Sequence, residues 1–360
     1  MGNMRVAYTV EQCWHRVPGG TAVAALRTAE AIVAGHPDVE LIGVAGRHRR
    51  SPQAPWRPTI PVSALPIAAP WLYEAWLRAG WPKVEGATGE VDVAHATTVI
   101  PCASDAPLVV TVHDLAFVHE PAHFTRHGVR VFRRSLERIA QQRALVLCSS
   151  TATIDDCVAA GLAPDRLRLV PLGVGGAAAT HVDVRRVRDR HGLPGEYVLF
   201  VGTVEPRKNL AALARAVASM DRPLPLVVAG AEGWGDRPVE LDHVRFLGFV
   251  PGDDLPGLYA GATVFAYPSL REGYGLPVLE AMAQGAPVVT SMGTATEETA
   301  GGAAVLVDPA SIESIADGLR EALERRDELS SAGRAHAANQ SWQRTAALTV
   351  AAYREAVAAA

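Results

Sequence analysis

The sequence predicts an α/β fold built from two Rossmann-like domains, each with a parallel sheet covered by helices. Short apolar β-type segments alternate with helix-type segments along most of the chain, which is typical of parallel sheets. Glycine-containing loops follow some of these strands and lead into helices, as in the opening unit of a Rossmann domain. The 360 residues suffice for two domains of ordinary size, each with its own core.

The composition is that of a globular protein, with 49% hydrophobic and 20% charged residues. A net charge of −4 argues against wholesale binding of nucleic acid. The four cysteines show no CxxC pairing, which favours a reducing compartment over a disulfide or zinc framework. The sequence has no signal-peptide layout at its start and no apolar run long enough for a bilayer. We therefore expect a cytoplasmic protein.

We expect the first domain over residues 1–172. A loop ending in Pro18-Gly19-Gly20 leads into a helix that begins at Thr21. The proline-rich segment 52–70 predicts neither a regular helix nor a central strand. The predicted strands are residues 5–10, 39–44, 91–95, 108–112, 144–149 and 167–172.

Two predicted helices of this domain each allow a second interpretation. The tryptophan-rich segment 70–82 favours a helix packed on the first domain, and the alternative is an acceptor or membrane-surface patch. Residues 128–143 predict an amphipathic helix with arginines along one side. Peripheral contact of this helix with anionic lipid stays open as an alternative. We do not favour it, because a charged stripe is usually a solvated face and the net charge is negative.

Residues 173–194 are expected to form an interdomain linker. The pattern Gly173-x-Gly175-x-x-Ala178 matches a dinucleotide-binding fingerprint and keeps an NAD-dependent oxidoreductase as an alternative. The segment that follows is short and charged rather than an apolar crossover helix, so we favour the linker.

The second domain is expected over residues 195–338, with helices predicted over 210–219 and 254–262. Two further helices are expected to finish the chain, the last over 341–357. The predicted strands are residues 197–201, 224–229, 244–247, 264–267, 288–290 and 305–307.

A pair of cations follows the first strand of this second domain. Gly202 begins the turn, and Arg207 and Lys208 come shortly after it. Open α/β sheets bind ligands at the carboxyl ends of their strands. Arginine offers a forked contact and lysine a point charge, so the two side chains suit a diphosphate.

Residues 271–291 predict a loop, a helix and a buried strand in succession. The loop contains Gly-Tyr-Gly-Leu-Pro, whose glycines let the backbone come close to a ligand, and Pro277 suits the first helical turn. The backbone N–H groups of Tyr274, Gly275 and Leu276 at the helix start predict a seat for phosphate oxygens.

Segment 271–291, REGYGLPVLEAMAQGAPVVTS, resembles the E-x7-E signature of the retaining nucleotide-sugar glycosyltransferases of family 4. Segment 200–210, FVGTVEPRKNL, resembles the second signature of that family. The resemblance covers nearly the whole chain. It implies a GT-B fold, in which two Rossmann-like domains face each other across a cleft. It also implies that a C-terminal helix, within residues 339–360, packs back on the first domain.

The resemblance also implies roles for particular residues. His113 would face the transferred sugar, Glu272 would hold the donor sugar's hydroxyls, and Glu280 would accept hydrogen bonds from the ribose. The residues expected to be catalytic are His113, Arg207, Lys208 and Glu272. The residues expected to bind the donor are Gly19, Gly20, Gly202, Arg207, Lys208, Phe249, Val250, Glu272, Tyr274, Gly275, Leu276 and Glu280.

The implied reaction moves a sugar from a nucleotide diphosphate to a hydroxyl of a glycan or glycoside, with retention at the anomeric carbon. We expect no cofactor and no obligatory metal, because the chain contains no D-x-D pair of the metal-chelating kind. The residues of the two signatures most resemble those of members that use GDP-mannose, and UDP-glucose is the alternative donor. A nucleotide-sugar epimerase on the same fold is the alternative from another class. The oligomeric state is left open.

Overall fold

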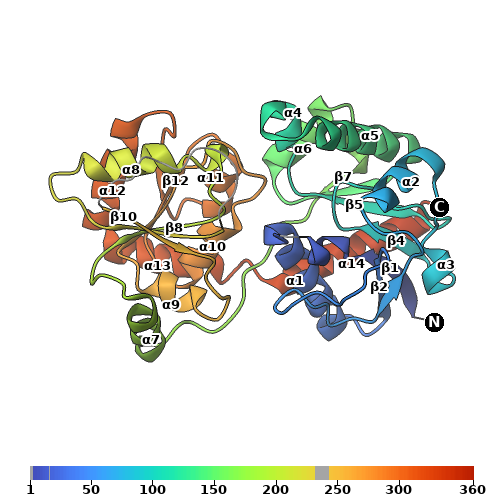
Figure 1. Cartoon of the computed structure of the whole chain (residues 1–360), viewed down its shortest axis with the longest axis horizontal. Coiled ribbons are helices and arrows are strands. Elements are labelled where there is room, and N and C mark those ends of the chain that lie inside the picture. Colours follow the sequence, from blue (N-terminus) through green and yellow to red (C-terminus); the bar gives the residue numbers. More distant parts are fainter. Residues whose placement is uncertain (1–2, 16, 232–242) are drawn as a thin grey trace. The chain divides into compact units, whose positions relative to one another are not determined.

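The computed structural model describes residues 3–15, 17–231 and 243–360. Its internal contacts divide the chain into two compact units. Unit 1 comprises Met1–Gly173 and Trp342–Ala360, and unit 2 comprises Val174–Ser341. Each unit holds one parallel sheet between layers of helices (Figure 1). This confirms the predicted class of two Rossmann-like α/β domains.

The sheet of unit 1 has seven parallel strands in the order β3-β2-β1-β4-β5-β6-β7. The strand order changes direction between β1 and β4, so the carboxyl ends of these two strands flank a topological switch point. Its strands are β1 (Met4–Thr9), β2 (Val39–Ala45), β3 (Val62–Ala64), β4 (Val93–Ala96), β5 (Leu108–Val112), β6 (Leu145–Cys148) and β7 (Leu167–Leu169). The sequence did not predict β3, a short edge strand in the proline-rich segment, where prolines are tolerated.

Helices cover both faces of the unit 1 sheet. On one face α1 packs against α14, which comes from the end of the chain, and on the other face α2 packs against α5 (Figure 1). The helices are η1 (Glu11–Trp14), α1 (Gly19–Gly35), α2 (Trp71–Ala79), α3 (Glu85–Thr88), α4 (Ala116–His119), η2 (Pro121–His123), α5 (Arg126–Gln142), α6 (Thr151–Ala159), η3 (Pro164–Arg166) and α14 (Trp342–Ala358). None of the helices in the described ranges is long and apolar enough to cross a membrane.

The tryptophan-rich segment forms α2, which packs on α5 within unit 1. This confirms the favoured interpretation of a helix packed on the first domain. Trp76 is buried in the core cluster and donates its indole N–H to the Pro82 carbonyl oxygen at 2.8 Å. Trp71 and Trp81 remain 72% and 54% exposed. Cys13, Cys102, Cys148 and Cys157 are all buried free thiols, which fits their expected role as small core residues.

The sheet of unit 2 has six parallel strands in the order β10-β9-β8-β11-β12-β13. Its switch point lies between β8 and β11. The strands are β8 (Val198–Val201), β9 (Leu226–Ala229), β10 (Val244–Gly248), β11 (Val264–Tyr267), β12 (Val288–Ser291) and β13 (Val305–Val307). The backbone after β8 passes so close to the end of β9 that a Cβ on Gly230 would lie 2.0 Å from the Gly202 carbonyl oxygen. Glycine is therefore required at position 230.

The helices of unit 2 also cover both faces of their sheet. Figure 1 shows α8 and α12 on one face and α9, α10 and α13 on the other. The helices are α7 (His181–His191), η4 (Pro206–Lys208), α8 (Leu210–Ala218), α9 (Leu255–Ala260), α10 (Leu276–Ala283), α11 (Ala295–Ala300), α12 (Ile312–Glu324), α13 (Arg326–Ala337).

Two parts of unit 2 differ from the sequence-based expectation. The segment 173–194, expected as a linker, contains α7, which starts with a capping box at Thr180 and packs on α9. Three helices rather than two finish the chain, because the backbone at Arg325 leaves the helical region and separates α12 from α13. Neither Gly nor Pro marks this break, so the pattern of residues did not reveal it.

Candidate active site

The switch point of unit 2 gathers the two signature segments. The loop after β8 carries η4, and the loop after β11 carries Glu272. Because β8 and β11 are neighbours, both loops leave the same edge of the sheet. The backbone N–H of Leu270 donates to the Arg207 carbonyl oxygen at 2.8 Å, which joins the two loops directly.

Three predicted site residues contact one another here. The Nζ atom of Lys208 donates to Glu272 Oε1 at 2.6 Å, and Arg207 Nη1 donates to Glu272 Oε2 at 3.1 Å. Lys208 also donates to the hydroxyl of Tyr267, whose ring centroid lies 4.9 Å from Nζ. Glu205 accepts from Arg207 Nε at 2.9 Å. The cluster therefore contains two cations and two carboxylates.

Burial and charge compete at this cluster. Burial alone would raise the pKa of Glu272, but the adjacent charges of Lys208 and Arg207 lower it to about 2. Burial lowers the pKa of Lys208, which is only 8% exposed, and the Glu272 carboxylate opposes that shift. Glu272 is thus a carboxylate at neutral pH, able to accept hydrogen bonds but not to donate a proton.

Asn209 fixes the position of the cation loop, a role that the sequence did not predict. Its backbone has a φ of 58°, in the left-handed region that asparagine tolerates better than most residues. Its side-chain amide donates to the carbonyl oxygens of Pro268 at 3.1 Å and Pro309 at 2.7 Å. The only sequence signal was its place between the two cations and a helix, which suggests a plain helix cap.

The predicted phosphate seat lies at the start of α10, which follows this loop. Gly275 precedes the helix with a φ of 95°, and a Cβ at this position would lie 2.7 Å from Thr296 Cγ2. The Thr299 hydroxyl donates to the Tyr274 carbonyl oxygen, so α11 supports the loop from behind. Tyr274, Gly275 and Leu276 are all buried, so the turn is fixed by its packing before the first turn of α10.

Glu280 lies within α10 and is partly exposed. The hydroxyl of Tyr259 donates to Glu280 Oε2 at 2.8 Å. Tyr259 is buried in α9, so this bond fixes the glutamate from beneath. Sequence reasoning missed Tyr259, since nothing in its spacing links it to Glu280.

The remaining donor-binding candidates of unit 2 lie along the same edge of its sheet. Gly202 follows β8 with a φ of 156°. Phe249 and Val250 follow β10, which β9 separates from β8. Phe249 is 61% exposed, whereas Val250 is buried.

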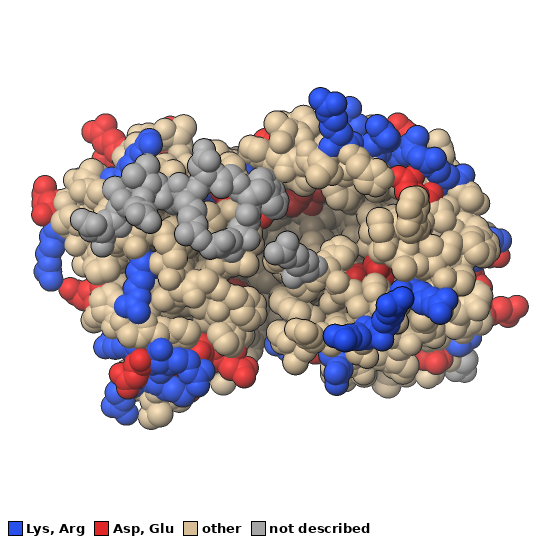
Figure 2. All heavy atoms as spheres, viewed as in Figure 1, with Lys and Arg blue, Asp and Glu red and all other residues tan. Residues whose placement is uncertain are grey.

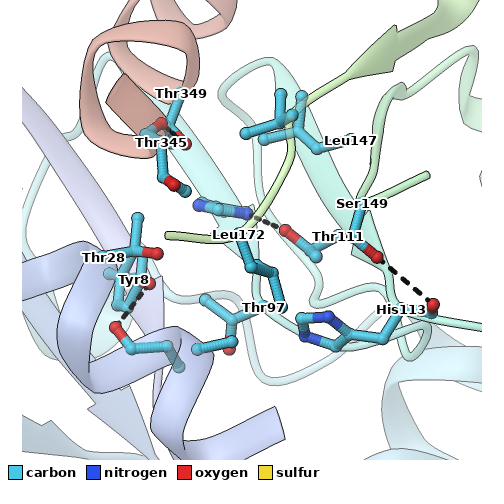
Figure 3. A pocket seen from close by; sticks show the side chains of 14 residues that line it. Tyr8, Thr28, Thr97, Thr111, His113, Leu147, Ser149, Leu172, Thr345 and Thr349 are labelled. Atoms are coloured by element: carbon cyan, nitrogen blue, oxygen red, sulfur yellow. Dashed lines mark hydrogen bonds between the residues drawn. The ribbon is translucent and has the colours of Figure 1, made fainter. Parts of the chain in front are cut away.

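In unit 1, His113 follows β5 and lines a small cavity (Figure 3). Its Nε2 atom is buried and has no hydrogen-bond partner among the described residues. Burial lowers the pKa of His113, although Asp114 and the Thr97 backbone oppose the shift, so the ring is neutral at pH 7. The cavity has about 20 Å³ open to the centre of a water molecule, enough for one water but not for a sugar ring.

His95 lines the same cavity but has a structural role. Its Nδ1 atom bonds the Tyr353 hydroxyl at 2.6 Å, and its Nε2 atom bonds Thr111 Oγ1 at 2.8 Å. Burial lowers its pKa to about 3. Gly19 and Gly20, expected in a loop, are instead the first residues of α1, and a Cβ on either would meet nothing within 4 Å.

The alternative of a dinucleotide site at residues 173–178 has little structural support. The segment 173–178 does not open a helix, because α7 begins at His181 with a cap of its own. In the described ranges, no three His, Cys, Asp or Glu side chains are placed to hold a metal ion together.

Two family models match the chain. Residues 18–175 match the model described as Glycosyltransferase Family 4, and residues 184–339 match that of Glycosyl transferases group 1. Together they cover both Rossmann-like units.

Curated relatives and solved structures agree with these matches. O-antigen chain mannosyltransferase B of Escherichia coli is 32% identical over 68% of this chain and 70% of its own length. D-inositol 3-phosphate glycosyltransferase of Salinispora arenicola is 35% identical over 70% of this chain and 64% of its own length. The structure of Anabaena HepE in complex with UDP and glucose superposes with a TM-score of 0.73 at 18% identity, over 98% of this chain and 100% of that one. This protein therefore belongs to glycosyltransferase family 4 and is a hexosyltransferase with the GT-B fold.

Proposed function

We propose that this glycosyltransferase moves mannose from GDP-mannose to a hydroxyl of a glycan or glycoside, with retention at the anomeric carbon. The observation that carries the proposal is the cluster of Arg207, Lys208 and Glu272 at the switch point of unit 2. The mannosyltransferase name of the E. coli relative supports mannose as the transferred sugar.

The difficult step in such a transfer is the departure of the nucleoside diphosphate from an oxocarbenium-like centre. Negative charge then grows on the leaving phosphate, and preorganised cations lower the barrier. Arg207 and Lys208 are held in place before the donor arrives by Glu205, Glu272 and Tyr267. The backbone turn at Gly275 adds N–H donors without a metal ion.

Glu272 accepts bonds from the donor sugar in this proposal rather than protonating the leaving group. Its pKa of about 2 keeps it ionised at neutral pH. Glu280, braced by Tyr259, accepts from the ribose hydroxyls. In unit 1, His113 remains the residue that the family resemblance assigns to the transferred sugar, and its Nε2 atom has no hydrogen-bond partner among the described residues.

Transfer of glucose from UDP-glucose is the second candidate, supported by the HepE structure, which is a complex with UDP and glucose. A donor screen separates the two. Purified protein is incubated with GDP-mannose or UDP-glucose and a panel of glycoside acceptors, and nucleotide release is measured.

We expect acceptor-dependent release of GDP but not of UDP. Release of UDP alone would reverse the choice of donor. Acceptor-independent release of free nucleotide from either donor would contradict transfer and favour an epimerase.

A further inference from the structure

The carboxyl edge of the unit 1 sheet carries a second cluster, which the proposed chemistry does not use. It is built from η1, which follows β1, and from residues 46–50, which follow β2. Gln12 in η1 donates to Thr97 Oγ1 at 2.8 Å, across the switch point to the end of β4. Open α/β sheets bind ligands at this position.

A buried carboxylate holds the two loops together. Glu11 is 3% exposed and accepts from the Gly46 backbone N–H at 2.6 Å and from His48 Nε2 at 2.9 Å. A Cβ on Gly46 would lie 2.8 Å from the Ile67 carbonyl oxygen, so only glycine allows this approach. Burying a carboxylate is costly unless donors surround it. Here the donors come from the loop that Glu11 fixes in place.

Two aromatic rings stack on each other beside this anchor. The rings of Trp14 and His48 stack with centroids 4.6 Å apart and an interplanar angle of 10°. The indole N–H of Trp14 donates to the Arg50 carbonyl oxygen at 2.8 Å, which fixes its orientation. Both side chains are partly exposed. Rigid aromatic surfaces of this kind bind ligands at little cost in conformational entropy.

Three arginines are next to His48 in the sequence, one before it and two after it. Arg47, Arg49 and Arg50 are all exposed. In the part of the chain that the structure describes, none of them forms an ion pair with a carboxylate. The whole chain carries a net charge of −4, so this short loop is a local concentration of positive charge.

We propose that these residues form a subsite for an anionic saccharide, a sugar that carries a phosphate or a carboxylate. We call it the platform subsite, comprising Trp14, His48, Arg47, Arg49 and Arg50. The sugar ring packs against the exposed part of the Trp14–His48 stack, and its anionic group contacts the arginine forks.

The platform subsite connects to the proposed reaction, on which its role rests. Thr97, which accepts from Gln12, also lines the His113 cavity (Figure 3). A saccharide on the platform therefore lies at the same sheet edge as His113. The platform subsite holds the acceptor, and the acceptor is anionic.

The test measures binding of two small probes to the full chain by saturation-transfer NMR and calorimetry. The probes are mannose 6-phosphate and methyl α-mannoside, which differ in charge. We expect mannose 6-phosphate to bind at least tenfold more tightly. Replacing the three arginines by serine (Arg47→Ser, Arg49→Ser, Arg50→Ser) should remove the preference for mannose 6-phosphate. Trp14→Ala should weaken the binding of both probes.

A matched control replaces two exposed arginines of α5, Arg130→Ser and Arg133→Ser, and leaves the preference intact. The proposal would be overturned if the control lost the preference for mannose 6-phosphate to the same extent. Equal binding of both probes to the wild type would also overturn it. The arginine variant alters only exposed side chains, so it tests the proposal even where Trp14→Ala does not fold.

Stabilisation by GDP, measured as a thermal shift in every variant, separates this inference from the proposed function. No shift with GDP or UDP in the wild type would contradict the nucleotide-sugar reaction itself. A normal shift combined with an unchanged probe preference in the arginine variant would contradict the platform subsite alone.

Discussion

The side-chain amide of Asn209 donates to the carbonyl oxygen of Pro309 at 2.7 Å, joining the start of α8 to the turn after β13. The same amide group also donates a hydrogen bond to the carbonyl oxygen of Pro268, which directly follows β11. One side chain thus holds three strand-end loops of unit 2 together. The distance between Lys208 and Glu272 depends on this arrangement.

We predict that Asn209→Gly raises the KM for the nucleotide sugar about tenfold, equivalent to about 1.4 kcal/mol. Glycine adopts a φ of 58° without strain, so this change removes only the two side-chain bonds. Steady-state kinetics with varied donor measures the effect. Ser219→Ala, which removes a bond at the opposite end of α8, is the control and keeps the wild-type KM. Equal effects in both variants would show that general loosening of α8, not the loop clamp, is responsible.

Replacing Lys208 by methionine should lower kcat/KM at least about 100-fold, as expected when one preorganised charge is lost from the leaving-group site. Methionine keeps an unbranched chain of similar length, so the protein should remain folded by circular dichroism. The matched control is Arg222→Met, which breaks an exposed ion pair with Glu196 in the same unit. Activity of Lys208→Met within threefold of the control would contradict a role in catalysis.

Removing the Tyr259 hydroxyl should weaken nucleotide binding. Tyr259→Phe keeps the buried ring and deletes only the hydrogen bond to Glu280. Loss of this bond should cost about 1 kcal/mol of binding free energy, which is about a fivefold increase in the Kd for GDP. Calorimetric titration with GDP measures the loss. Tyr197→Phe deletes another buried hydroxyl bond in unit 2, to the Leu258 carbonyl oxygen, and should leave GDP affinity unchanged.

Acid should destabilise unit 2 through Asp254, which accepts from Arg186 at 2.6 Å, Arg190 at 2.9 Å and His191 at 3.0 Å. Although burial raises the pKa of Asp254, these α7 partners lower it to about 2, below its ordinary value of 3.8. Its stabilising contribution is therefore present above about pH 4 and is lost as the pH falls towards 2.

The test compares denaturant unfolding of wild type and Asp254→Asn across this range. At pH 7 we expect the variant to be less stable by about 2 kcal/mol, since it loses bonds to charged groups. The two stability curves should converge near pH 2. A constant difference between them at all pH values would refute the titration of Asp254.

Much of the fold was predictable because its signals are local. The buried apolar strands of both sheets and the glycine before α10 follow from residue type and spacing. The break at Arg325 and the helix α7 were not predictable in this way. The charged face of α7 is stabilised by Asp254, which lies far along the chain and became visible only in the structure.

The candidate site shows the same division. Arg207, Lys208 and Glu272 were predicted as site residues, and the structure brings them into contact. The supporting residues Asn209 and Tyr259 were missed, because each acts through a partner on another element. The sequence also gave no sign that Trp14 and His48 stack, since they lie on separate loops.

The position of α14 has a consequence for biosynthesis. Tyr353 is fully buried in unit 1 and bonds His95, yet the ribosome makes it after all of unit 2. Unit 2 is contiguous in the sequence, whereas unit 1 lacks a helix of its core until the residues of α14 have been made. The half whose synthesis begins first is therefore the half whose residues are completed last.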